Sequence, residues 1–242
     1  MAKSNTKGTN FLVQGSILAI ASIISRIIGL IYRIPMTAII GDVGNNYYAA
    51  AFDIYNVMLI ISSYSLPLAV SKLVSAKMAK GQFKTAYQVL KGALLFALVS
   101  GTIVAVIVFF GAGFFTKTLL STPNSIFALR VLAPALVIVA VLGVIRGFFQ
   151  GLGTMMPSAV SQIIEQVVNA IVSVWAAYVL YRVGAKTGAV LGDKEHYAAA
   201  YGAAGGTLGT NLGSVAALLF VLFVFAVYLR VFKRIMKKDR HI

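Results

Sequence analysis

Long stretches of apolar residues alternate with short polar segments along the whole chain. Each apolar stretch has the roughly 20 mostly apolar residues that a helix needs to cross a bilayer, and all are too long for the strands of a membrane barrel. The pattern predicts an all-α fold, a polytopic transmembrane helical bundle. Proline removes a backbone donor, so we expect kinks at Pro35, Pro67 and Pro134. Six spans are predicted, at residues 11–40, 46–71, 86–115, 126–150, 157–183 and 198–232.

Composition agrees with a membrane protein. Of 242 residues, 60% are hydrophobic and only 11% are charged, whereas soluble domains average about 25% charged residues. The chain has no cysteine, which excludes disulfides and thiolate sites. The net charge of +15 comes from cations that mostly flank the apolar stretches. This arrangement is typical of membrane topology, so we expect membrane lipids and no nucleic acid as partners.

The positions of the cations predict the orientation. They are concentrated in residues 1–10, in the connection over residues 72–84 and in residues 233–242, whereas the connection after the first span has none. Because cytoplasmic loops carry the excess of lysine and arginine, both termini should be cytoplasmic. The domains are then a cytoplasmic N-terminus (1–10), a six-helix transmembrane lobe (11–232) and a basic cytoplasmic tail (233–242).

Three glycines recur every four residues at the start of the last span. Gly205, Gly209 and Gly213 therefore share one helix face. Small residues at this spacing let membrane helices approach closely, which favours a packing role. A flexible gating helix is the alternative.

Motifs for catalysis are missing from the sequence. It contains neither the phosphate-binding loop GxxxxGK[ST] nor HExxH. The two histidines, His196 and His241, lie outside the spans, so neither a histidine metal cluster nor a Ser-His-Asp set can form within them. We expect a protein that is not an enzyme and needs no cofactor or metal.

Charged residues inside the spans form two candidate pairs. An ionisable residue costs roughly 2.5–3.5 kcal/mol on insertion scales and needs a partner or a water-filled cavity. If the first hairpin turns near residue 43, Arg33 and Asp53 lie at equal depth. If the hairpin near residue 155 is symmetric, Arg146 and Glu165 also match. Each pair could be a structural ion pair, or could face a cavity and exchange partners with a substrate.

Arg26 has no such partner. The position at its depth on the second span falls near Ile60, and Arg26 lies about 22 Å along the helix from Phe11. Seven residues are almost two turns, so Arg26 and Arg33 share a helix face. Guanidinium groups bind two phosphate oxygens at once, which favours a phosphate or pyrophosphate ligand. Pairing of Arg26 with a helix outside this chain is the alternative.

Three blocks of the sequence resemble a known family. They are SRIIGLIYRIP (25–35), NNYYAAAFDIYNVMLIISSYSLPLAVSKLVS (45–75) and RVLAPALVIVAVLGVIRGFFQGLGTMMPSAVSQIIEQ (130–166). They are similar to the polysaccharide-biosynthesis flippases of Gram-positive bacteria, which include stage V sporulation protein B-like and MurJ-like lipid II flippases. These proteins belong to the multidrug/oligosaccharidyl-lipid/polysaccharide exporter superfamily.

The resemblance implies a transport function in the bacterial cytoplasmic membrane. Members move undecaprenyl-pyrophosphate-linked glycans, such as a lipid II-like peptidoglycan precursor or a polysaccharide repeat unit, by alternating access. First-helix arginines engage the pyrophosphate, a role that falls to Arg26. The residues predicted to bind the substrate are Arg26, Arg33, Asp53 and Asn56. Two features depart from the MurJ-like pattern: the second arginine lies seven rather than six residues on, and Leu59 and Ile60 stand where a second-helix arginine is expected.

Members have about fourteen helices in two lobes related by a pseudo-twofold axis. Six spans correspond to the N-terminal lobe. We therefore expect the C-terminal lobe, or a second chain, to supply the other wall of the transport cavity and any coupling-ion site. The membrane potential could also drive transport. Two alternatives remain open. One is a cation-coupled multidrug exporter, which the stacked arginines disfavour because they repel cationic drugs. The other is a non-transporting lobe that acts as a membrane scaffold.

Overall fold

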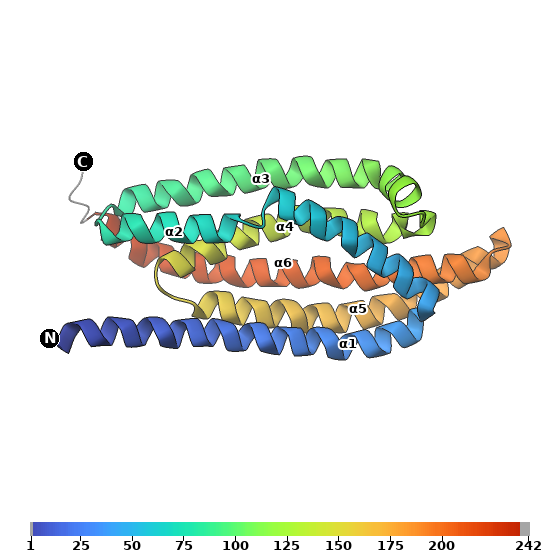
Figure 1. Ribbon diagram of the computed structural model, residues 1–242, viewed down its shortest axis with the longest axis horizontal. Coiled ribbons are helices and arrows are strands. Elements are labelled where there is room, and N and C mark those ends of the chain that lie inside the picture. Colours follow the sequence, from blue (N-terminus) through green and yellow to red (C-terminus); the bar gives the residue numbers. More distant parts are fainter. Residues whose placement is uncertain (1, 238–242) are drawn as a thin grey trace.

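The chain folds into a bundle of long helices. The computed structural model describes residues 2–237, with side chains from Leu12 onward, and this part contains helices and turns (Figure 1). The last residues of the predicted tail lie outside the described residues. In chain order the elements are α1 (Ala2–Ser62), α2 (Leu66–Ala79), α3 (Phe83–Phe114), the π-helix η1 (Phe115–Leu119), the 3-10 turn η2 (Pro123–Ser125), α4 (Ile126–Gly151), α5 (Met156–Leu191) and α6 (Lys194–Met236).

Helix α1 reverses its direction at Gly41. This glycine has φ 68° and ψ −177°, a backbone conformation that other residues rarely adopt. The first half of α1 runs along one edge of the bundle, and the return half runs back toward α2 (Figure 1). Gly41 is the residue of α1 with non-helical dihedral angles, and Pro35 lies inside the helix, which continues through it.

The second predicted span, residues 46–71, is divided between two helices. It contains most of the return half of α1, a break at residues 63–65 and the start of α2. Pro67 lies in the first turn of α2, where its missing N–H leaves no helical hydrogen bond unmade. Pro134 lies inside α4, which continues through it.

Five segments of the described chain are long and apolar enough to cross a membrane, whereas the sequence predicted six spans. The difference arises because the first segment, Leu12–Ala79, contains both of the first two predicted spans in 68 residues. A straight helix of that length would measure about 100 Å, more than three times the roughly 30 Å of a hydrocarbon core. The reversal at Gly41 folds this segment back on itself.

Glycines bring α5 and α6 into close contact. A Cβ atom added at Gly209 would lie 2.6 Å from the Asn169 backbone oxygen, and one at Gly213 would lie 2.5 Å from the Glu165 backbone oxygen. At Gly205 it would overlap the Ala176 carbonyl group. The packing role predicted from the four-residue spacing is confirmed, because only glycine leaves room for the α5 backbone at these three positions.

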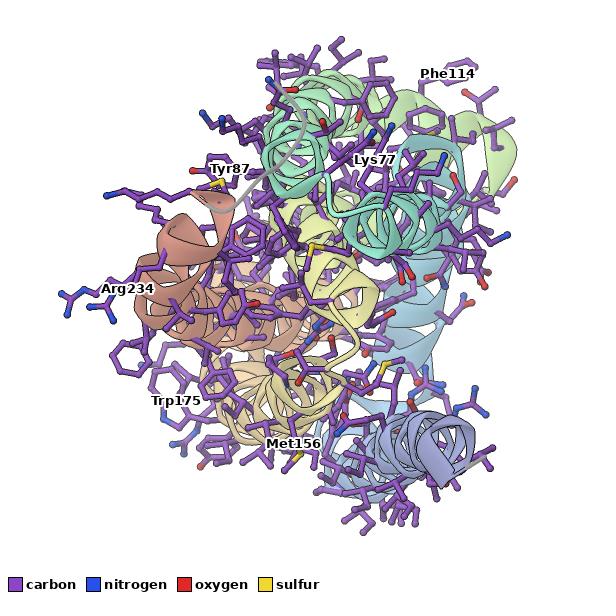
Figure 2. All side chains as sticks on the ribbon, turned by 90° about the vertical axis from the view of Figure 1, so that its left-hand side faces the viewer. Lys77, Tyr87, Phe114, Met156, Trp175 and Arg234 are labelled. Atoms are coloured by element: carbon purple, nitrogen blue, oxygen red, sulfur yellow. The ribbon has the colours of Figure 1, made fainter. Side chains whose placement is uncertain are left out.

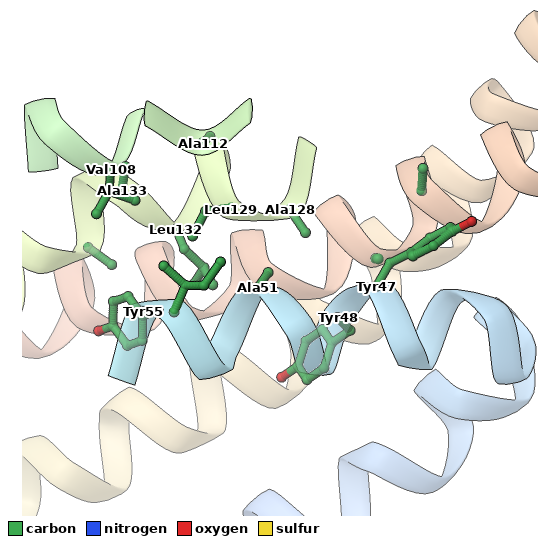
Figure 3. Packing of buried hydrophobic residues seen from close by; sticks show 14 of the residues in the cluster. Tyr47, Tyr48, Ala51, Tyr55, Val108, Ala112, Ala128, Leu129, Leu132 and Ala133 are labelled. Carbon is green, nitrogen blue, oxygen red and sulfur yellow. The ribbon is translucent and has the colours of Figure 1, made fainter. Parts of the chain in front are cut away.

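The largest core cluster lies where the return half of α1 meets α3, α4 and α6. Figure 3 shows Ala51 and Tyr55 of α1 near Leu129 and Leu132 of α4. Many of its other members are alanines. In a bilayer, close van der Waals packing of small residues holds helices together, so this cluster fixes the return half against the bundle.

The start of α1 and the end of α6 lie at the same end of the bundle, which we call the terminal end (Figure 1). The α2–α3 turn is also there, and Figure 2 looks onto this end, with Lys77 and Arg234 labelled. Those of the orienting cations that the structure describes therefore gather at one end. A cytoplasmic location of that end stays a prediction.

Candidate functional site

A polar pocket of about 530 Å³ lies between the two halves of α1. We call it the arginine pocket. Six of its lining residues are Gly29, Leu30, Tyr32, Tyr48, Ala49 and Phe52. All four residues predicted to bind substrate line it: Arg26, Arg33, Asp53 and Asn56.

The reversal at Gly41 explains which residues meet in this pocket. Arg26 and Asn56 lie 15 residues before and after Gly41, so they are level across the two halves of α1. Asp53, twelve residues after the turn, is level with a position between Arg26 and Arg33. The turn predicted from the sequence was near residue 43, two residues after the observed turn at Gly41. This difference gave the wrong pairing of residues across the two halves of α1.

The predicted ion pair between Arg33 and Asp53 is absent. Among the residues that the structure describes, neither takes part in an ion pair within 4.0 Å. By the observed register Arg33 is level with Ala49, and its Cζ atom lies 5.6 Å from the ring centroid of Tyr48. This is a cation–π contact.

A series of hydrogen bonds between buried side chains holds two tyrosines that line the arginine pocket. The Tyr32 and Tyr48 hydroxyl oxygens lie 3.4 Å apart, and Asn169 Nδ2 donates to the Tyr32 hydroxyl at 3.3 Å. Ser173 Oγ in turn donates to Asn169 Oδ1 at 2.8 Å. All four residues are buried. These hydrogen bonds therefore join both halves of α1 to α5.

The predicted pair between Arg146 and Glu165 is confirmed. Arg146 Nη2 lies 2.8 Å from Glu165 Oε2, and the two side chains are 15% and 19% exposed. Arg146 Nε also donates to Ser161 Oγ at 2.8 Å, and Ser214 Oγ donates to Glu165 Oε1 at 3.3 Å. The pair thus sits in a small polar cluster that joins α4, α5 and α6.

The arginine pocket has the composition of an anion site. It holds two guanidinium groups and one carboxylate, and all three side chains belong to exposed residues of this chain. A fork of guanidinium donors matches the oxygens of a phosphate group. Within the described part of the chain, no group of three or more histidine, aspartate or glutamate side chains could hold a metal ion.

Comparison with known proteins assigns the family. The model of the family described as "Polysaccharide biosynthesis protein" matches residues 11–238. The chain belongs to this family. Together with its apolar helices, membership makes the chain a multi-pass membrane protein. No solved structure matches it significantly.

Three curated relatives, all from Bacillus subtilis (strain 168), are similar to this chain. The lipid II flippase MurJ is 31% identical over 181 residues, which cover 71% of this chain and 33% of that protein. Stage V sporulation protein B is 30% identical over 153 residues, covering 63% and 30%. The uncharacterized membrane protein YabM is 27% identical over 179 residues, covering 73% and 32%. The chain spans about a third of the length of these relatives.

Sequence reasoning missed the tyrosines and Asn169. Tyr32 and Tyr48 occur within apolar runs, where aromatic residues count as apolar and their hydroxyl groups give no signal. Asn169 did give a signal in the sequence, because a polar side chain inside a predicted span needs a hydrogen-bond partner. The identity of that partner depends on how α1 packs on α5, and this packing could not be predicted from the sequence.

Proposed function

We propose that the chain forms one wall of a flippase that moves a lipid-linked glycan across the cytoplasmic membrane. In this role Arg26 and Arg33 bind the pyrophosphate that joins the lipid to the glycan. The relatives named as lipid II flippase MurJ and stage V sporulation protein B support this class of substrate. A peptidoglycan precursor and a polysaccharide repeat unit both belong to it.

The observation that carries the proposal is the arginine pocket itself. Two guanidinium groups face one pocket of about 530 Å³ within membrane-spanning helices, and neither is in an ion pair with a described residue. Charged groups at such depth are costly unless a ligand, a partner or water satisfies them. An anionic headgroup satisfies both and neutralises their charge.

The same charges disfavour export of cationic drugs. With Arg26, Arg33 and Asp53 the pocket carries a net positive charge, so a cationic drug would be repelled on entry. A second lobe or a second chain would cover the exposed arginines and complete the pathway. The membrane potential or a coupling ion would drive transport, and the terminal end would face the cytoplasm.

A translocation assay tests this function. Proteoliposomes would contain the protein together with the lobe or second chain that completes the pathway, and a fluorescent polyprenyl-pyrophosphoryl N-acetylhexosamine. A membrane-impermeant quencher would report arrival at the outer leaflet. We expect translocation by the wild type and by Arg130→Ala, an exposed arginine outside the pocket, and none by Arg26→Ala. Wild-type protein that binds this lipid without moving it faster than protein-free vesicles would favour a scaffold instead.

A further inference from the structure

A second polar pocket, of about 250 Å³, lies beside the break between α1 and α2. We call it the glutamine pocket. Residues of the break, α4 and α5 line it, together with an apolar floor that includes Pro67 and Val139. Its polar lining residues are Ser63, Tyr64, Arg146, Gln150 and Gln162.

The glutamine pocket lies about one helical turn beyond the arginine pocket along α1, toward the break that follows this helix. Leu59, one turn beyond Asn56 on the return half, lines it. On the first half, Ser22 lies one turn before Arg26 and donates to Gln162 Oε1 at 3.2 Å. Seven residues separate Asn56 from Ser63, which is about 10 Å along a helix. This is a short enough step for adjacent groups of one ligand to occupy both pockets.

The charge of the glutamine pocket is balanced internally. Arg146 is its one charged lining residue, and Glu165 lies 2.8 Å from it in an ion pair. The arginine pocket, by contrast, has an excess of positive charge. A neutral group therefore suits the glutamine pocket, whereas an anion suits the arginine pocket.

Both glutamines have one end free for a ligand. Gln162 uses its oxygen to accept from Ser22, and Gln150 uses Nε2 to donate to Ser158 Oγ at 3.3 Å. Gln162 Nε2 and Gln150 Oε1 have no hydrogen-bond partner among the described residues, so one donor and one acceptor remain. A hydroxyl group both donates and accepts, and it can satisfy the two together. Within a membrane-spanning bundle, leaving them unsatisfied is costly.

We propose that the glutamine pocket is a sugar subsite, which takes the neutral, hydroxyl-bearing ring attached directly to the pyrophosphate. The inference rests on the proposed function, because it requires the pyrophosphate to lie at Arg26 and Arg33. The volume equals roughly eight water molecules at about 30 Å³ each, enough for one ring and not for a long glycan. The first sugar would then point from the arginines toward the α1–α2 break.

Binding of two lipids that differ by one sugar distinguishes the sugar subsite from the headgroup site. Binding to protein in nanodiscs would be measured for a polyprenyl pyrophosphate without sugar and for the same lipid carrying one N-acetylhexosamine. We expect the wild type to bind the glycosylated lipid about tenfold more tightly. Gln162→Leu and Gln150→Leu should each lose most of that preference and still bind the bare lipid as the wild type does. Gln88→Leu, the same change at an exposed position on α3, should keep the preference.

The controls identify the cause of a negative result. Ser22→Ala removes the hydrogen bonds of this hydroxyl to Gln162 and to the Leu18 backbone oxygen, and leaves both glutamines in place. It should retain most of the preference, which distinguishes a lost ligand contact from a disturbed fold. Equal wild-type affinity for both lipids, or an unchanged preference in both glutamine variants, would overturn the sugar subsite and leave the headgroup site standing. Failure of the wild type to bind either lipid would overturn the proposed function as well.

Discussion

The hydroxyl oxygens of Tyr32 and Tyr48 lie 3.4 Å apart and connect the two halves of α1 across the arginine pocket. Asn169 holds this contact from α5 through Tyr32. The ring of Tyr48 also faces the guanidinium group of Arg33. One pair of tyrosines therefore both holds the hairpin together and positions an arginine proposed to bind the substrate.

The two functions of Tyr48 can be separated by substitution. Tyr48→Phe removes the hydroxyl contact and keeps the ring, so it should lower the free energy of unfolding by about 0.5–1 kcal/mol with little effect on headgroup affinity. Tyr48→Leu also removes the cation–π contact and should weaken binding of polyprenyl pyrophosphate several-fold. Equilibrium unfolding in mixed micelles and binding in nanodiscs measure the two effects. Equal affinities for the phenylalanine and leucine variants would rule out a positioning role for the ring.

Gly209 is expected to tolerate no side chain. A methyl group there would lie 2.6 Å from the Asn169 backbone oxygen, so α5 and α6 would have to separate. Gly209→Ala should therefore destabilise the protein by about 1–3 kcal/mol in the same unfolding assay. The matched control is Gly92→Ala in α3, where no atom lies within 4 Å of the added methyl group and alanine is the better helix former. If the control lost as much stability as Gly209→Ala, close packing would not be the cause.

The pair of Arg146 and Glu165 should tolerate an exchange of its charges. Arg146→Glu alone places two carboxylates together and should cost about 3–5 kcal/mol of stability. The double variant Arg146→Glu with Glu165→Arg should recover most of it, because the hydroxyls of Ser161 and Ser214 can either donate or accept. Since Arg146 also lines the glutamine pocket, the exchanged protein should fold and yet lose its preference for the glycosylated lipid. A double variant as unstable as the single one would contradict the pairing account.

Much of the fold follows from periodicity and composition. Apolar length predicted the helical spans, and the four-residue glycine spacing predicted the contact between α5 and α6. The pair of Arg146 and Glu165 followed from hairpin symmetry because its turn lies where the sequence placed it. These features depend on local patterns or on one short connection.

The details of the arginine pocket could not be predicted in the same way. The turn of α1 consists of one glycine, Gly41, and not the several polar residues that follow it, so the register across the hairpin shifted. This shift removed the pair of Arg33 and Asp53 and brought Asn56 level with Arg26. The break at residues 63–65 lies just before Pro67 at the start of α2, and apolar length alone does not reveal it.

The turn at Gly41 should control both stability and binding. Gly41→Ala requires an alanine at φ 68° and ψ −177°, which should cost about 1–3 kcal/mol. A change in the turn would also displace Arg26 relative to Asn56, so affinity for polyprenyl pyrophosphate should fall. Gly15→Ala serves as the control, because it lies within the first half of α1 with open space around it. Wild-type stability and affinity in Gly41→Ala would show that the register does not depend on this glycine.

The central claim is that Arg26 binds the pyrophosphate of a lipid-linked glycan. The most direct test is the dissociation constant for polyprenyl pyrophosphate, measured in nanodiscs for the wild type, Arg26→Ala and Arg130→Ala. Loss of one charge-assisted contact of about 1.5–3 kcal/mol should weaken binding by roughly ten- to a hundredfold in Arg26→Ala, and Arg130→Ala should bind as the wild type does. Equal affinities for folded Arg26→Ala and wild-type protein would contradict the account.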